Sequence, residues 1–175
     1  EIFYFSEDYN KLWEKFKNKY DLLAIRDSSR LNWFFFSSKN LSSLRRVLEI
    51  RNDLKLMGYV VVNVVRLPVK NRQYYFYDWI DSMIVGGGGE VYFAILRALY
   101  ELAAKDEKNI ILIRTTSFDP YIEKYLTRFG FQQKTEEQNI LLRYPNNELG
   151  ANKLVNTNLK EYFSPLDGDR GFFIG

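Results

Sequence analysis

The spacing of apolar residues changes midway along the chain, and this change constrains the fold most. Residues 73–85 (QYYFYDWIDSMIV) form a long strand pattern, whereas residues 90–104 (EVYFAILRALYELAA) place apolar side chains on one helical stripe. Residues 109–114 (NIILIR) are a short continuous apolar run, which predicts a strand covered on both faces. A strand–helix–strand unit of this length predicts two parallel strands joined by a right-handed crossover.

The N-terminal part predicts a helix and an antiparallel pair of strands. Residues 7–19 have apolar side chains at helical spacing, and Ser6 is a candidate N-cap for this helix. Residues 44–51 and 56–66 are rich in β-branched residues and predict paired strands joined by a turn at Asn52–Asp53.

The C-terminal part predicts one more helix and a closing hairpin. Residues 119–129 begin with Asp119–Pro120, a good N-cap and first-turn pair, and end before Gly130, a helix-stop signal. Residues 131–134 and 139–144 have the pattern of a β-hairpin. The predicted fold class is therefore α/β with a mixed (α+β) sheet, in which antiparallel N-terminal strands precede a β-α-β-α-β-β series.

Two missing residue types restrict the chemistry. The 175 residues include no Cys and no His, which excludes disulfides, thiol nucleophiles, Ser-His-Asp triads and metal sites built from Cys or His. Any catalysis must use Asp, Glu, Tyr, Lys, water or the backbone. The length predicts one domain, residues 1–175, with a core over about residues 20–145 and a tail, 146–175, packed on it.

Charge and hydropathy restrict the partners. The net charge is +3, and the Lys and Arg residues are scattered, so nucleic-acid binding is only a remote alternative. No apolar run approaches the roughly 20 residues of a membrane span. No signal peptide is visible, so the expected location is the cytoplasm. The first residue is Glu rather than Met, which is compatible with a fragment of a longer protein that has a companion domain.

Four short segments resemble the GNAT superfamily of N-acetyltransferases. Residues 26–34 (RDSSRLNWF) are similar to an "RD…LNW" segment of a GNAT-like acyltransferase branch that includes domains linked to polysaccharide modification. Residues 58–61 (GYVV) resemble the strand that follows this segment in the family, and residues 77–80 (YDWI) resemble the family's strand before the cofactor loop. Residues 129–131 (FGF) resemble the end of the last helix of the family's motif. The resemblance covers roughly residues 20–170 and implies a GNAT-like acyl-CoA N-acyltransferase fold.

The resemblance implies a site for acetyl-CoA or another acyl-CoA, and no metal. In GNAT enzymes a Q/R-x-x-G-x-G/A loop at the start of a helix binds the pyrophosphate through backbone amides. Gly87 and Gly89 match its glycines, whereas Ile84 replaces the Gln or Arg, and Glu90 places a negative charge at the helix start. The implied cofactor-binding residues are Ile84, Val85, Gly86, Gly87, Gly88, Gly89 and Thr115, the last as a partner for the pantetheine chain.

Asp78, Tyr125 and Tyr121 are the candidate catalytic residues. Asp78 and Asp81 lie in an apolar strand, so each needs a partner or a solvent-lined cleft. They are three residues apart, which predicts that they point to opposite faces of the sheet. Asp78 is the first candidate for the base, and the alternative is a structural hydrogen bond.

A tyrosine could return a proton to the departing CoA thiolate. Tyr121 and Tyr125 share one helix face, and aromatic packing is the alternative role for both. GNAT enzymes often have a Tyr four residues before the glycine of the "GF" pair, and that position is Leu126 in this chain.

The aromatic and arginine residues of the N-terminal half allow two interpretations. Residues 28–36 fit either a helical turn or a strand, and their Trp33–Phe36 cluster is predicted to be core rather than the lining of an acceptor pocket. Four arginines are predicted to be solvated surface charges, with binding of an anionic acceptor or CoA phosphates as the alternative. These are Arg26, Arg30, Arg45 and Arg46.

The leading hypothesis is a GNAT-like N-acyltransferase. A primary amine, on a small molecule or a polysaccharide precursor, would attack the acyl-CoA thioester directly, without a covalent enzyme intermediate. The mismatches at Ile84 and Leu126 favour a second hypothesis, a catalytically silent module that binds CoA or a protein partner. A homodimer or a companion domain is compatible with either.

Overall fold

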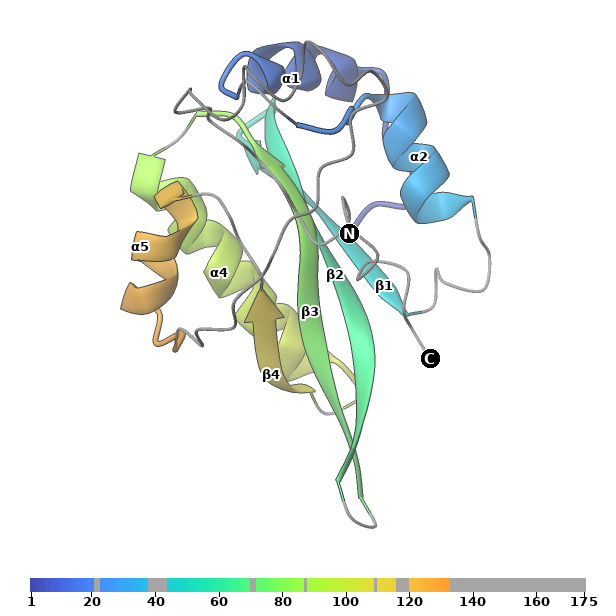
Figure 1. Ribbon diagram of the computed structural model, residues 1–175, viewed down its shortest axis with the longest axis vertical. Coiled ribbons are helices and arrows are strands. Elements are labelled where there is room, and N and C mark those ends of the chain that lie inside the picture. The colour runs from blue at the N-terminus through green and yellow to red at the C-terminus, as the bar shows by residue number, and fades with distance from the viewer. Residues whose placement is uncertain are drawn as a thin grey trace, which may run out of the picture.

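The computed structural model describes residues 1–20, 23–37, 44–69, 72–86, 88–108, 110–115 and 120–132. Four strands form one sheet in the order β1-β2-β3-β4 (Figure 1). The strands are β1 (Arg45–Asn52), β2 (Lys55–Val69), β3 (Arg72–Ile84) and β4 (Ile110–Thr115). Neighbours β1, β2 and β3 pair antiparallel, and β4 runs parallel to β3. The predicted α/β class with a mixed sheet is confirmed.

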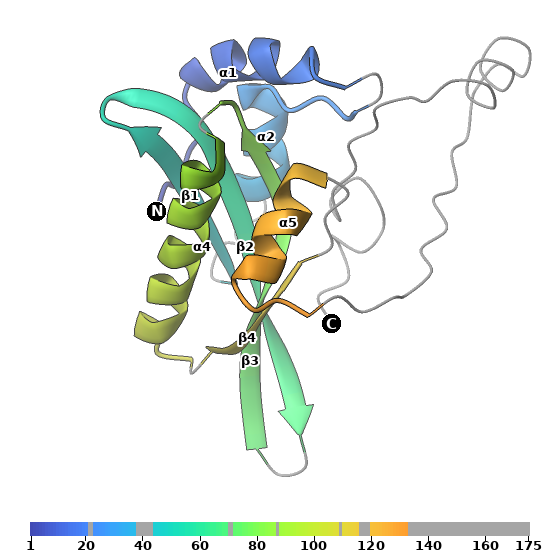
Figure 2. The same cartoon turned by 90° about the vertical axis from the view of Figure 1, so that its left-hand side faces the viewer.

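Helices cover both faces of this sheet. Helices α1 (Asp8–Lys17) and α2 (Ser28–Phe36) lie on one face, which we call the α1/α2 face (Figure 1). Helices α4 (Gly88–Lys105) and α5 (Pro120–Arg128) lie on the α4/α5 face (Figure 2). Each face has its own apolar core. Buried members on the α1/α2 face include Phe5, Tyr9, Leu31, Tyr59 and Ile80. Those on the α4/α5 face include Val62, Tyr77, Trp79, Leu96 and Leu99.

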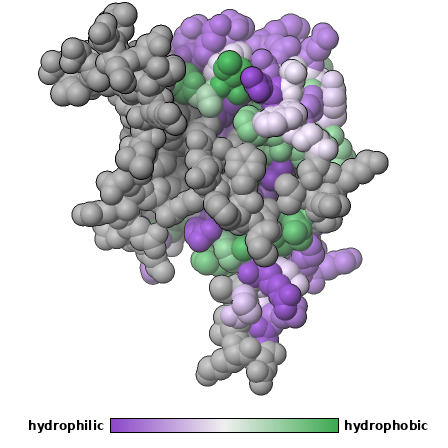
Figure 3. All heavy atoms as spheres, turned by 45° about the vertical axis from the view of Figure 1, so that its right-hand side comes forward, coloured by the Kyte–Doolittle hydropathy of each residue, from purple (hydrophilic) through white to green (hydrophobic). Residues whose placement is uncertain are grey.

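The two N-terminal helices begin in different ways. Helix α1 buries Tyr9, Leu12 and Phe16, and its outer surface is hydrophilic (Figure 3). No side chain caps it, so the predicted Ser6 cap is wrong; only the backbone carbonyl of Ser6 accepts a bond, from the Tyr9 N–H at 3.1 Å. Helix α2 is capped by Asp27, whose carboxylate accepts the Arg30 N–H at 2.7 Å. This cap explains why the ambiguous segment 28–36 is helical.

The helical form of residues 28–36 also separates the side chains of the aromatic cluster. Successive residues of a helix point in different directions, so they cannot all face one core. Phe35 is 1% exposed, as predicted, whereas Trp33 is 57% exposed, so the core prediction is wrong for Trp33.

The end of α5 follows the sequence signal. Gly130 has φ +83°, and its N–H donates to the Thr127 carbonyl at 3.1 Å. The Phe131 N–H donates to the Leu126 carbonyl, also at 3.1 Å, which completes a Schellman motif. The predicted cap Asp119 and the tail 146–175 lie outside the described residues, and so does the closing hairpin except for 131–132, which form no strand.

Strand β4 is less covered than its apolar sequence predicts. Ile111 and Leu112 are each 51% exposed, so the prediction of a strand buried on both faces is wrong. Among the described strands, β4 pairs only with β3 and forms the edge of the sheet.

Gly58 allows β2 and β3 to approach closely. A Cβ atom at this position would lie 2.1 Å from the backbone oxygen of Met83. We expect Gly58→Ala to lower the free energy of unfolding by about 1–3 kcal/mol, measured by urea denaturation. Gly88→Ala is the control, because its Cβ meets nothing within 4 Å and costs only the strain of a positive φ. Equal effects of the two variants would contradict the prediction.

Asp106 connects the end of α4 to the sheet and should make the fold acid-sensitive. Its carboxylate accepts hydrogen bonds from the Tyr77 hydroxyl at 2.8 Å and from the Lys108 backbone N–H at 2.9 Å. It also lies 3.5 Å from the Arg46 guanidinium. Burial opposes ionisation of Asp106, but these three interactions together keep its pKa below the usual value. Such a group stabilises the folded state above the usual carboxyl pKa of about 4, and this stability is lost as the pH falls further.

Asp106→Asn should therefore make the free energy of unfolding less dependent on pH in the acidic range below about pH 4. We expect wild type to be more stable than the variant at neutral pH, and the difference to shrink as the pH falls below about 4. Thermal unfolding of both proteins across this range provides the measurement. A difference that stays constant with pH would show that the Asp106 charge has no part in it.

Candidate functional site

The described pairing between β3 and β4 stops halfway along β3. Their last register pair joins Trp79 to Thr115, whereas β3 continues through residues 80–84, which we call the β3 extension. Within the described chain, no strand continues β4 beside this extension. Backbone amides and carbonyls at such a point can bind an extended ligand in place of a strand.

A β-bulge lies at the start of the β3 extension. Val61 pairs with Asp81 and Val62 with Trp79, so Ile80 has no partner in β2. The extra residue shifts the alternation of side chains, and both Ile80 and Asp81 face the α1/α2 side. Asp78 points to that same side, because its neighbours in β3 belong to the core of the α4/α5 face. The prediction that Asp78 and Asp81 point to opposite faces is therefore wrong.

Asp78 forms an ion pair with Arg114, its register partner on β4. The guanidinium Nε donates to Oδ1 at 3.0 Å and Nη2 donates to Oδ2 at 2.7 Å. The Asp78 side chain is 16% exposed and that of Arg114 is 57% exposed. Arg114 is not among the site residues predicted from the sequence, although a charged residue at the end of an apolar strand is a signal for such a role. The base candidate thus lies beside a cation, next to the last described pair of β3 and β4.

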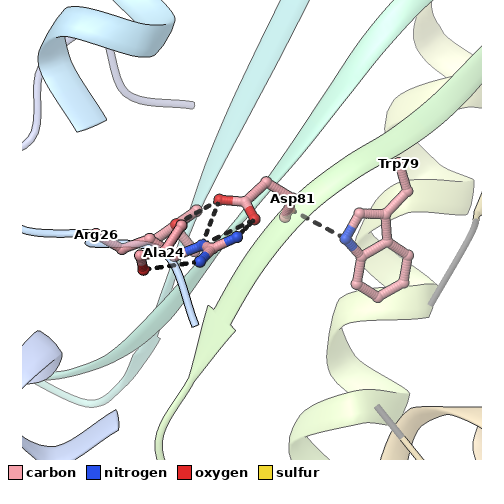
Figure 4. Close-up of polar contacts among 5 residues, drawn as sticks. Ala24, Arg26, Trp79 and Asp81 are labelled. Atoms are coloured by element: carbon pink, nitrogen blue, oxygen red, sulfur yellow. Dashed lines mark hydrogen bonds and ion pairs between the residues drawn. The ribbon is translucent and has the colours of Figure 1, made fainter. Parts of the chain in front are cut away.

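Asp81 is buried in a polar network on the α1/α2 side (Figure 4). Its carboxylate accepts a hydrogen bond from Arg26 Nε at 3.1 Å and lies 3.0 Å from Arg26 Nη2. The Tyr59 hydroxyl donates to the other oxygen at 2.6 Å, and Arg26 Nη1 donates to the Ala24 carbonyl at 3.0 Å. Because Arg26 and Asp81 are both 1% exposed, Arg26 is not the solvated surface charge that its sequence position predicts.

Arg45 is a second buried arginine, and the surface prediction is wrong for it too. Its Nε donates to Asn63 Oδ1 at 3.0 Å, and its Nη1 donates to the carbonyls of Phe34 and Phe35 at the end of α2. Burial lowers the pKa of its guanidinium. Hydrogen bonds and the negative end of the α2 dipole stabilise the buried charge. Of the remaining two arginines, Arg30 is exposed as predicted, and Arg46 is partly buried against Asp106 and Glu1.

The four glycines at 86–89 lie where the β3 extension is joined to α4, and we call this segment the glycine turn. Gly86 has φ +80° and Gly88 has φ +51°, which favours glycine at both positions, while Gly87 lies outside the described residues. Helix α4 begins at Gly88, and the first amides of a helix lack carbonyl partners within it. The Val85 N–H already donates to the Met57 carbonyl at 2.8 Å, and the Ile84 carbonyl accepts Lys19 Nζ at 3.2 Å.

Tyr125 contacts the glycine turn. A Cβ atom at Gly89 would lie 2.9 Å from the Tyr125 hydroxyl oxygen, so the hydroxyl lies against the first turn of α4. Its ring stacks on Tyr92 with centroids 5.1 Å apart. Leu126, at the position where GNAT enzymes often have Tyr, is buried in the core. The side chain of Tyr121 lies outside the described residues, although its backbone belongs to α5.

The candidate residues thus form two groups. Tyr125 and the glycine turn are at one end of the β3 extension, and Asp78, Arg114 and Thr115 are at the other. The five residues between them span roughly 17 Å at about 3.3 Å per residue. The two ends suit an elongated ligand with different chemistry at each end. Across the part of the chain that the structure describes, no helix is long and apolar enough to cross a membrane, and no three acidic side chains gather as a metal site.

Comparisons with known proteins find similarity at the level of structure. No family model and no curated protein matches the sequence. An integron cassette protein from the mobile metagenome of V. cholerae is 16% identical, with TM-score 0.52 over 85% of this chain and 89% of that one. Ribosomal-protein-alanine N-acetyltransferase from Brucella melitensis is 15% identical, with TM-score 0.51 over 79% and 91%. A probable acetyltransferase is 20% identical, with TM-score 0.50 over 78% and 89%. At these identities, the likeness establishes the fold of the chain.

Proposed function

We propose that this chain, which has the GNAT fold, transfers an acyl group from acyl-CoA to a primary amine. The observation that carries the proposal is the β3 extension, which has no β4 partner among the described residues and leads to a glycine turn and a helix N-terminus. Acetyl-CoA has a pyrophosphate at one end and a thioester at the other. The two groups of candidate residues at the two ends of the β3 extension match these two chemistries.

The glycine turn is the proposed site for the pyrophosphate. The first amides of α4 and the positive end of its dipole favour an anion there, although Glu90 in the first turn opposes it. Of the proposed cofactor-binding residues, Ile84 and Val85 would contribute backbone or apolar contacts, since the Val85 N–H is occupied by Met57. Thr115 would bind the pantetheine chain at the last described pair of β3 and β4.

Asp78 is the proposed base. Its carboxylate would accept a proton from the attacking amine, directly or through water, and the amine would bond to the thioester carbonyl carbon. The tetrahedral intermediate would then expel the CoA thiolate. Arg114 holds the carboxylate in place, so the acceptor must bind beside this ion pair.

A tyrosine of α5 is the proposed acid that returns a proton to the thiolate. Tyr125 and Tyr121 are the two candidates. The Tyr125 hydroxyl lies against Gly89, at the pyrophosphate end and roughly 17 Å along the β3 extension from Asp78, so Tyr121 is the first candidate. Comparing Tyr125→Phe with Tyr121→Phe distinguishes them, because the acid is the residue whose loss slows turnover at unchanged CoA affinity. The acceptor would be an amine on a small molecule or a polysaccharide precursor, and the reaction would take place in the cytoplasm, where acyl-CoA is made. We also propose that residues 1–175 form one domain, which acts with a companion domain or as a homodimer.

A CoA-binding module without catalysis is the second candidate function. Three observations favour it: Ile84 replaces the usual polar residue, the Val85 N–H is occupied, and Asp78 is already bonded twice to Arg114. Such a module would bind CoA and acetyl-CoA with similar affinity and would acetylate no amine.

Calorimetric titration with acetyl-CoA and with free CoA tests the proposal. We expect both to bind in the micromolar range, and an acceptor screen with amino sugars and simple amines to yield acetylated product. Gly89→Ala should weaken binding, since its Cβ displaces Tyr125 from the turn. Binding without any product would favour the silent module. No binding at millimolar CoA would reject both functions for this chain.

A further inference from the structure

Asp81 is held from both faces of the sheet. On the α1/α2 side its carboxylate bonds Arg26, from the segment before α2, and Tyr59, from β2. On the other side the Trp79 indole Nε1 donates to the backbone carbonyl of Asp81 at 3.1 Å, and that indole belongs to the core under α4 and α5 (Figure 4). A residue fixed by both its side chain and its carbonyl has little freedom to shift along the strand.

The bulge at Ile80 makes these contacts compatible. In a strand without a bulge, side chains alternate strictly, and Asp81 would point into the apolar core of the α4/α5 face with Trp79. Burying an ionised carboxylate there without a partner is costly. A one-residue slip of β3 would also reverse the facing of every residue after the slip. Pairing with Arg26 therefore favours a bulged β3 over a regular one, because only the bulge places the Asp81 carboxylate beside this arginine.

We propose that the Arg26–Asp81 ion pair fixes the register of the β3 extension against β2, a role that we call the register lock. The pair is fully buried, and its position decides where the bulge lies. Buried ion pairs often add little net stability compared with apolar residues of similar volume, but they can specify one arrangement over another. For its effect on the reaction this inference rests on the proposed function: Arg26 and Asp81 are positioning residues, which hold the backbone between the glycine turn and Asp78.

An apolar replacement of the whole network tests the lock. The variant Arg26→Met/Tyr59→Phe/Asp81→Leu removes the three bonded polar side chains together, so that no charged or hydroxyl group among them stays buried without its partner. The matched control, Arg45→Met/Asn63→Leu, removes another buried polar contact, at 3.0 Å between β1 and β2, and leaves the bulge untouched. We expect both variants to fold with midpoints within about 5 °C of wild type.

Register is read by NMR from cross-strand contacts between β2 and β3. Wild type and control should pair Val61 with position 81 and Val62 with Trp79, whereas the apolar variant should show a shifted or mixed register. The control should bind CoA like wild type. In the apolar variant CoA affinity should fall, and turnover should drop by about 100-fold, as expected when reacting groups are misplaced by about 1 Å.

The outcomes separate the lock from the proposed function. Wild-type register in the apolar variant overturns the lock, whatever happens to CoA. A shifted register with unchanged CoA affinity and turnover overturns the positioning role. If wild type binds no CoA, the proposed function fails, while the NMR comparison still decides the lock. If the apolar variant does not fold, Asp81→Asn replaces it: a second set of amide signals for residues 80–84 supports the lock, and a single wild-type set overturns it.

Discussion

Arg26→Ala is expected to lower the free energy of unfolding by about 3–5 kcal/mol. The substitution leaves the Asp81 carboxylate buried, with the Tyr59 hydroxyl but without its cation. It also removes the bond from Nη1 to the Ala24 carbonyl, which holds the segment before α2. Since a domain is typically stable by only about 5–15 kcal/mol, the expected loss is a large fraction of the total stability.

Urea denaturation followed by fluorescence measures this effect. The matched control is Arg97→Ala, which removes an ion pair with Glu101 at 2.9 Å on the exposed surface of α4. We expect that control to leave the denaturation midpoint almost unchanged, because exposed ion pairs contribute little. If Arg26→Ala shifted the midpoint no more than the control, the carboxylate would have to be solvated or neutralised without its arginine.

Asp78→Asn is expected to slow turnover by about 100-fold or more, with CoA affinity unchanged. Asparagine keeps the shape of the side chain but accepts no proton from the amine. The variant should stay folded, because its partner Arg114 is 57% exposed and can be hydrated when the ion pair is lost. Steady-state kinetics with an acceptor from the screen, together with CoA titration, gives both quantities.

Asp106→Asn is the matched control for this experiment. Asp106 is also a hydrogen-bonded carboxylate, but it bonds Tyr77 and Lys108 beyond the end of α4 rather than Arg114. The control should retain wild-type turnover at neutral pH and moderate temperature. Wild-type turnover in Asp78→Asn would rule out Asp78 as the base, and it would leave the cofactor site to be judged from the titrations alone.

Elements with strong local signals were predictable from the sequence. The change of period around residues 86–89 identified the crossover from β3 to α4, and Gly130 identified the end of α5. In each case the signal lies within a few residues of the structure that it specifies. The aromatic segment 28–36 was ambiguous because the pattern of its side chains fits two periods, and the Asp27 cap decides between them.

Features that depend on distant contacts were not predictable in this way. The bulge reverses the facing of Asp81 and brings its carboxylate to Arg26, which is 55 residues away in the chain. The sequence correctly indicated that Asp78 and Asp81 each need a partner, but it could not name Arg114 or Arg26. The burial of β4 was overestimated for the same reason, since an apolar run does not specify what packs against it.

The long β2–β3 hairpin has a consequence for solubility. It extends beyond the rest of the sheet in both views, past the ends of β1 and β4 (Figures 1 and 2). Strand edges without a neighbour can pair with other chains and nucleate aggregation. Arg66 and Arg72 place exposed charges on this arm, and Pro68 provides no N–H for an incoming strand. These three residues protect the arm from edge-to-edge association, so replacing them with apolar β-formers would turn it into a site for self-assembly.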